Sequence, residues 1–153
     1  MQIIKITSQN IQEHLSALIT LNDQFLDNLD ISKQRTRQQK EAILRNMVKP
    51  NSPTHLLIGY QDQQAVGMTY FNEGTGYSCG GDYIWINSMF IVQEEQSKGH
   101  GSAFLSYIED WATAKGGVTL IVSSRDTANK HSGNLFKSKG YEQSENVWIA
   151  KKL

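Results

Sequence analysis

Residues 93–104 read QEEQSKGHGSAF, and they lie between a long apolar run and an amphipathic segment. The apolar run is 83–92, YIWINSMFIV, and the amphipathic segment is 102–115, in which apolar residues recur at helical spacing. A strand is therefore expected to become a helix across Gly99 and Gly101, with a lysine and a serine beside them. This stretch is either a glycine-rich turn or a loop that binds an anion.

The glycine stretch has the chemistry that a phosphate group needs. The first turn of a helix presents free backbone N–H groups and the positive end of the helix dipole. Gly99 and Gly101 remove side chains that would keep a diphosphate from the backbone, and both permit a positive φ. Gln96, Lys98 and Ser102 can add side-chain donors.

Two common phosphate-binding motifs are absent from the sequence. The chain contains no G-x-x-x-x-G-K-[ST] motif, and Phe104 stands where the third glycine of a G-x-G-x-x-G motif would be. No acidic residue ends the next apolar strand, which closes as VSSR at 122–125. The residues alone leave both interpretations open, the plain turn and the phosphate loop.

The composition is typical of a soluble globular protein. Of the 153 residues, 39% are hydrophobic and 20% are charged, and this length predicts one domain, residues 1–153. Fifteen basic and fifteen acidic residues cancel, so we expect no nucleic-acid or membrane partner. No signal peptide or membrane-spanning apolar run is visible. The single cysteine, Cys79, suits the reducing cytoplasm and has no histidine near it in sequence.

Two helices are predicted in the first third of the chain. The first begins at Asn10, which forms a capping-box pattern with Glu13, and it runs to about residue 29. Ser32 can cap the second helix, which ends before Pro50. The apolar side of the second helix comprises Ile43, Leu44, Met47 and Val48.

The rest of the chain is rich in strands, and the predicted fold class is α/β of the mixed, α+β kind. The strand 83–92 is apolar on both faces, which predicts a central strand covered on two sides by helices. The strand–helix–strand unit 83–122 indicates a parallel pair in a mixed, mostly antiparallel sheet. A loop is expected at 73–81 and a short helix from Asn129. The predicted strands are 2–7, 55–60, 65–71, 83–92, 118–122 and 146–152.

The glycine stretch and a later segment resemble the two motifs of the GCN5-related N-acetyltransferases. QSKGHG at 96–101 is similar to the motif [RQ]-x-x-G-x-[GA], which in that family follows a long strand and opens the central helix. The segment 129–141 resembles the second motif, and the order of the elements agrees, so the resemblance covers most of the chain and implies the acyl-CoA N-acyltransferase fold. The matching residues of the second motif are Asn129, Ser132, Leu135, Phe136, Gly140 and Tyr141.

The resemblance implies which residues hold acetyl-CoA, the expected co-substrate. The backbone of Phe90, Ile91 and Val92 would hydrogen-bond the pantetheine arm, as an added strand. Asn129 would contact this arm with Ser132 in the same motif, and Phe136 would line the thioester end. No metal is expected, because no second ligand accompanies His100. The loop residues that the resemblance assigns to the diphosphate are Gln96, Ser97, Lys98, Gly99, His100, Gly101 and Ser102.

The activity that the resemblance implies is direct transfer of an acetyl group from acetyl-CoA to a primary amine. The amine must lose a proton, the oxyanion needs a donor such as the amide of Phe90 or Ile91, and the thiolate leaves. Asn87 stands where many members carry a glutamate base, and Phe136 stands where many carry a tyrosine acid. Asn87 and its neighbour Ser88 are the catalytic candidates; the alternative is that they make structural hydrogen bonds within a buried strand.

The expected amine acceptor, which the sequence does not identify, is a small molecule, a polyamine or a peptide. Asp23, Asp27 and Asp30 recur near a helix C-terminus, where each costs on the order of 0.3–1 kcal/mol, so they either attract a cationic amine or form a solvated face. Tyr70 and Glu73 are further acceptor candidates.

Two alternative functions stay open. One is a non-catalytic acyl-CoA-binding or sensing module, and the other is a domain that binds the phosphates of a different nucleotide. The last strand, which contains Trp148, can pair across a homodimer.

Overall fold

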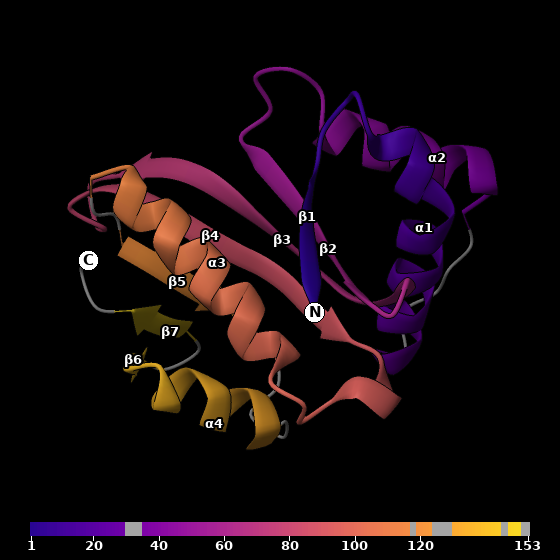
Figure 1. Ribbon diagram of the computed structural model, residues 1–153. Helices are drawn as coiled ribbons and strands as arrows, with labels where there is room; N and C mark the ends of the chain where they lie inside the picture. The colour runs from indigo at the N-terminus through magenta and orange to yellow at the C-terminus, as the bar shows by residue number, and fades with distance from the viewer. Residues whose placement is uncertain (30–34, 117–118, 124–129, 145–146, 151–153) are drawn as a thin grey trace. The chain divides into compact units, whose positions relative to one another are not determined.

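The computed structural model describes residues 1–29, 35–116, 119–123, 130–144 and 147–150 (Figure 1). A 3-10 turn, Gln93–Glu95, lies between the strand Gly81–Ile91 and the helix His100–Ala114. The predicted order of elements is confirmed. The structure has one further strand, which the polar segment 141–144 forms. The elements are β1 Gln2–Ile6, α1 Ile11–Asn28, α2 Arg37–Met47, β2 Thr54–Gln61, β3 Gln64–Gly76, β4 Gly81–Ile91, α3 His100–Ala114, β5 Thr119–Ser123, α4 Lys130–Ser138, β6 Tyr141–Ser144 and β7 Val147–Ala150.

The seven strands within the described residues follow the hydrogen-bonded order β1-β2-β3-β4-β5-β7-β6. The β4–β5 pair is parallel, from Tyr83 beside Thr119 to Ile86 beside Val122. The pairs β1–β2, β5–β7 and β6–β7 are antiparallel. The predicted fold class, a mixed sheet with one parallel pair and helices, is confirmed.

The last strand cannot pair across a homodimer as the sequence suggested. β7 is hydrogen-bonded to β5 on one edge, where Ile149 lies beside Ile121, and to β6 on the other, where Ile149 lies beside Glu142. Both edges of β7 are therefore used within the chain. A homodimer stays a prediction without this interface, and the side chain of Trp148 lies outside the described part of the structure.

The chain forms two compact units, and each is described by itself. Unit 1 comprises residues 1–70 and 89–100, and unit 2 comprises 71–88 and 101–153. The strands β3 and β4 contribute residues to both units. The expectation of a single domain over 1–153 stays a prediction.

Unit 1 has an apolar core made by α1, α2, the first three strands and the end of β4. The apolar residues of α1 face this core because they recur three or four positions apart. On α2 the structure corrects the predicted apolar side: Leu44 and Val48 are buried, but Ile43 is 46% exposed. The core residues are Ile6, Ile11, Leu15, Leu18, Ile19, Leu21, Leu44, Val48, Leu56, Ile58, Met68 and Phe90.

The start of α1 was predicted at the right residue with the wrong contact. Asn10 is the N-cap, but its side chain makes no capping hydrogen bond to the helix. The Asn10 amide instead accepts from Thr7 N–H at 2.8 Å and donates to the Lys5 carbonyl at 3.0 Å. The side chain thus fastens the turn between β1 and α1.

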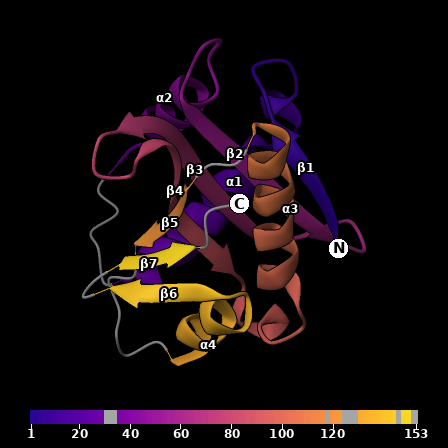
Figure 2. The same cartoon turned by 90° about the vertical axis from the view of Figure 1, so that its left-hand side faces the viewer.

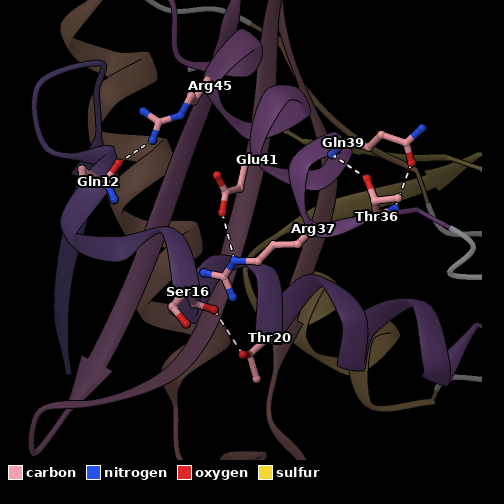
Figure 3. Close-up of polar contacts among 8 residues, drawn as sticks. All are labelled: Gln12, Ser16, Thr20, Thr36, Arg37, Gln39, Glu41 and Arg45. Atoms are coloured by element: carbon pink, nitrogen blue, oxygen red, sulfur yellow. Dashed lines mark hydrogen bonds and ion pairs between the residues drawn. The ribbon is translucent and has the colours of Figure 1, made fainter.

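The second helix begins later than the sequence suggested. Thr36 is its N-cap, and Thr36 and Gln39 form a capping box in which Gln39 N–H donates to Thr36 Oγ1 at 3.2 Å and Thr36 N–H donates to Gln39 Oε1 at 2.9 Å (Figure 3). The predicted cap, Ser32, lies outside the described residues. Arg45 donates to Gln12, which links α2 to α1.

Unit 2 contains the hairpin tip between β3 and β4 and the helices α3 and α4. The predicted loop 73–81 is shorter in the structure, because β3 continues to Gly76 and only 77–80 form the tip. The Phe71 ring meets the Trp111 ring of α3 edge-on, with 5.4 Å between centroids. α4 lies along β6, as Figure 2 shows. Buried apolar residues of this unit include Phe71, Ile84, Ile86, Phe104, Leu105, Ile108 and Leu120.

Candidate functional site

The glycine stretch has a backbone that suits an anion. Ser97 and Gly99 have left-handed conformations, with φ of +62° and +86°, and α3 begins at His100. Of the two glycines that permit a positive φ, Gly99 adopts one and Gly101 is helical, while Ser97 has the second positive φ of this stretch. Left-handed residues that alternate with others turn successive N–H groups toward one point, which forms an anion-binding nest. A Cβ at Gly99 would meet no atom within 4 Å, so the space beside this backbone is open.

The Glu95 carboxylate connects the residues that flank this turn. Glu95 Oε1 accepts from Lys98 Nζ at 2.8 Å, and Glu95 Oε2 lies 2.9 Å from His100 Nε2. Because a carboxylate only accepts, Nε2 of the buried His100 ring carries a hydrogen and donates it. Lys98 and His100 were predicted to contact the phosphate, whereas Glu95 was not among the predicted site residues. Its spacing, three residues before Lys98 and five before His100, was the available signal.

The contact with Lys98, and then that with His100, lowers the pKa of the Glu95 carboxyl below its usual value of 4.5. A carboxyl whose pKa is lower in the folded state adds stability above pH 4.5, and this contribution is lost as the pH falls through the lowered value. We therefore expect Glu95→Gln to be less stable than the wild type at pH 6, and the difference to shrink toward pH 3. Urea unfolding of both proteins across this range tests the prediction, and a difference that is constant with pH would contradict it.

Two backbone groups at the end of β4, which were expected to bind the pantetheine arm, have partners within the chain. Gln96 Nε2 donates to the Ile91 carbonyl at 3.1 Å, so this side chain, predicted to reach the diphosphate, is bound to the strand. Val92 N–H donates to the Val66 carbonyl at 2.9 Å. Two of the backbone groups that were expected to bind the pantetheine arm therefore already have partners. The Phe90 side chain lies in the core of unit 1, so only its backbone is available to a ligand.

The catalytic candidates lie on β4 in unit 2. Asn87 is exposed, which corrects the expectation that it is a buried polar group in need of a structural partner. Ser88 is half-buried and has an interaction partner, as expected for a polar residue within a strand. Within the described residues the β4–β5 pairs run from Tyr83 beside Thr119 to Ile86 beside Val122, and both candidates follow Ile86 along β4.

Of the remaining residues assigned to acetyl-CoA, Gly101 and Ser102 lie in α3, and Ser132 and Phe136 lie in α4. Gly101 and Ser102 are in the first turn of α3 and half-buried. Asn129 lies outside the described residues, as does the side chain of Ser132, although the backbone of α4 includes it. Phe136 is buried, and its ring packs on Tyr141 with 5.5 Å between centroids. Burial and then the nearby Glu109 raise the pKa of Tyr141, so this phenol stays protonated.

Two of the five acceptor candidates are engaged in ion pairs, and Asp30 lies outside the described residues. Asp23 Oδ2 accepts from Lys40 Nζ at 2.7 Å in unit 1. Glu73 Oε2 accepts from Lys115 Nζ at 2.7 Å in unit 2, and this ammonium lies 4.4 Å from the centroid of the Trp111 ring. Asp27 is exposed at the end of α1, and Tyr70 packs against the core of unit 1.

The part of the chain that the structure describes holds neither a metal-binding cluster nor a membrane-spanning helix. Within the ranges that the structure describes, no three His, Cys, Asp or Glu side chains are grouped to hold a metal ion. Among the described residues, no helix has the length and apolar character that crossing a membrane requires.

Solved structures of acetyltransferases have a similar fold. An aminoglycoside acetyltransferase from an uncultured soil metagenomic sample, solved in complex with trehalose, is 13% identical with a TM-score of 0.76, over 95% of this chain and 90% of that one. A predicted acetyltransferase from Clostridium acetobutylicum, solved with acetyl-CoA, is 13% identical with a TM-score of 0.70, over 94% and 91%. A ribosomal-protein-alanine N-acetyltransferase from Brucella melitensis is 12% identical with a TM-score of 0.65, over 90% of each chain.

The family follows from the sequence itself. A search of curated proteins finds no match to this chain. The model of the acetyltransferase (GNAT) family matches residues 18–141, which include the glycine stretch, both catalytic candidates and Phe136. The chain therefore belongs to the acetyltransferase (GNAT) family.

Proposed function

We propose that this enzyme transfers an acetyl group from acetyl-CoA directly to a primary amine, with no covalent enzyme intermediate. Family membership makes the chain an acetyltransferase, and the proposal adds the donor, the acceptor class and the residues. The observation that carries it is the backbone of the glycine stretch. Two left-handed residues, Ser97 and Gly99, come immediately before the N-terminus of α3, and a backbone of this kind can bind the oxygens of a diphosphate.

The residues present fit the diphosphate of coenzyme A. The N–H groups of 97–102 would donate to its oxygens, and the open space beside Gly99 lets the ligand approach the backbone. The Lys98 ammonium, whose side chain is 55% exposed, adds a positive charge close to this backbone. Lys98 is also paired with Glu95, so its charge is shared between the carboxylate and any bound anion.

The backbone of β4 would supply the donor for the oxyanion. The N–H groups of a strand point alternately to its two edges. Val92 N–H points to Val66, so Phe90 N–H faces the same edge, whereas Ile91 N–H faces the other, where the Ile91 carbonyl accepts from Gln96. Of the two amides considered, that of Ile91 is therefore the better candidate for the oxyanion donor.

The reaction forms the C–N bond and breaks the C–S bond, with the electron pair leaving on sulfur. Acetyl-CoA supplies a thioester carbonyl that a neutral amine attacks. Asn87 cannot remove a proton from the amine, but as an exposed amide on β4 it can hold a water molecule that does so. Phe136 has no proton to donate, so the thiolate would be protonated by solvent. Proximity and orientation alone supply about 7–11 kcal/mol in favourable cases, so catalysis does not require these two groups.

The acceptor remains a primary amine on a small molecule, a polyamine or a peptide. Of the acceptor candidates, Asp23 and Glu73 are partly neutralised by Lys40 and Lys115. An acceptor that carries several positive charges would have to compete with these lysines. We also expect a cytoplasmic location, in agreement with the single Cys79.

The test is a screen of amines with the purified protein and acetyl-CoA. We expect release of the coenzyme A thiol to depend on an added amine, and mass spectrometry to show that amine acetylated. Binding of acetyl-CoA with no turnover for any amine would contradict the proposal and favour the acyl-CoA-binding module. Binding of ATP or NAD in preference to coenzyme A would instead favour a domain for another nucleotide.

A further inference from the structure

The Glu95 carboxylate spans the turn that is proposed to bind the diphosphate. One oxygen accepts from Lys98, which lies between the left-handed residues Ser97 and Gly99, and the other accepts from His100, which follows them. Both contacts are short, at 2.8 and 2.9 Å. Each carboxylate oxygen therefore fixes a different point of the turn.

The surroundings of Glu95 favour a fixed carboxylate. Its side chain is 22% exposed, and the His100 side chain is 10% exposed, so this contact is partly buried. The preceding 3-10 turn Gln93–Glu95 holds the backbone of Glu95, and Gln96 is tied to the carbonyl of Ile91. The backbone of Glu95 is thus held close to the end of β4, and its carboxylate contacts the turn that follows.

A carboxylate beside an anion-binding turn needs an explanation, because its negative charge repels a phosphate. Two explanations are physically distinct. The carboxylate can hold the turn in its binding conformation, which reduces the entropy lost when the ligand binds. Alternatively, it can occupy the Lys98 and His100 donors and compete with the phosphate for them. The first requires Glu95 for binding, whereas the second predicts tighter binding without it.

We infer that Glu95 is a positioning residue that holds 96–100 in the conformation that receives the diphosphate of acetyl-CoA. This inference rests on the proposed function. The bridging geometry favours it over competition, because the carboxylate contacts residues on both sides of Gly99, the position where the backbone is most free to rearrange. Ser97, a non-glycine residue with a positive φ, also needs its neighbours to keep it there.

The variant Glu95→Gln removes the charge and keeps the size of the side chain. Its matched control is Glu94→Gln, which removes the same charge one residue earlier, from an exposed side chain. KM and kcat are measured with acetyl-CoA and with S-acetylpantetheine, which has the same thioester arm but no diphosphate. We expect Glu95→Gln to raise the KM for acetyl-CoA about tenfold, with kcat and the KM for S-acetylpantetheine within about twofold of the wild type. Glu94→Gln is expected to change none of these values more than about twofold.

A second readout needs no ligand. Amide hydrogen exchange at 97–100 is expected to be faster in Glu95→Gln than in the wild type, and unchanged in Glu94→Gln, because the turn opens more often without its bridge. This comparison supports the inference even if Glu95→Gln is too unstable for kinetics at high temperature.

Three results would overturn the inference. A KM for acetyl-CoA that is unchanged or lower in Glu95→Gln would mean that the carboxylate is not needed or competes with the ligand. An equal loss with both thioesters would mean general damage to the protein. A wild type that uses neither thioester would overturn the proposed function. If the wild type is active but Glu95→Gln does not show the expected rise in the KM for acetyl-CoA, only the inference about Glu95 is overturned.

Discussion

Gly101→Glu is expected to weaken the binding of acetyl-CoA about 100-fold, which corresponds to the loss of one or two charge-assisted hydrogen bonds. Gly101 is the second residue of α3, where backbone N–H groups are free to bind the diphosphate. A glutamate side chain would occupy that space and repel the phosphates. The same carboxylate interacts favourably with the positive end of the helix dipole and stabilises α3 by about 0.3–1 kcal/mol, so α3 should still form. Calorimetric titration with acetyl-CoA measures the change.

The control for this variant is Gln39→Glu, which adds the same charge to the first turn of α2. The side chain at this position accepts from Thr36 N–H, and a carboxylate can keep that contact. We expect this control to bind acetyl-CoA with unchanged affinity. Equal binding by wild type and Gly101→Glu, with circular dichroism showing both folded, would mean that the diphosphate lies elsewhere.

Phe90→Ala is expected to lower the free energy of unfolding by about 3–5 kcal/mol. Phe90 is 7% exposed, belongs to the core of unit 1, and its ring lies 5.9 Å from that of Phe25. The cavity left by its removal would be next to the end of β4, from which the glycine stretch continues. Urea unfolding measures this loss.

The matched control is Ile43→Ala, which removes an apolar side chain from the same unit at an exposed position. Its effect should be within about 0.5 kcal/mol, because little apolar surface is lost from the core. A similar loss for Phe90→Ala and Ile43→Ala would show that Phe90 does not anchor the strand.

The sequence was sufficient for features that depend on neighbouring residues. The strand 83–92, the turn at Gly99 and the start of α3 follow from periodicity and glycine positions within about twenty residues. The Thr36–Gln39 capping box also matches a local pattern, and Ser32 was chosen wrongly because it too is a good N-cap residue. The left-handed Ser97 could not be predicted, since serine has no preference for a positive φ.

Contacts between residues far apart in the chain could not be predicted from the sequence. Asp23 and Lys40 are 17 residues apart, and Glu73 and Lys115 are 42 apart, so each pair depends on how helices and strands pack. For the same reason, Asp23 and Glu73 were predicted to be available to an acceptor, because their lysine partners could not be identified from the sequence. The exposure of Asn87 was also missed, because an apolar strand suggests burial on both faces, whereas Asn87 itself is exposed.

The central claim is that the backbone of the glycine stretch binds the diphosphate of acetyl-CoA. The most direct measurement is a titration of the isotope-labelled protein with acetyl-CoA, followed by the backbone amide resonances of 97–102. The account predicts that these resonances shift on binding, and that S-acetylpantetheine, which has no diphosphate, leaves them nearly unchanged. Binding of acetyl-CoA that shifts other amides and not these would contradict the account.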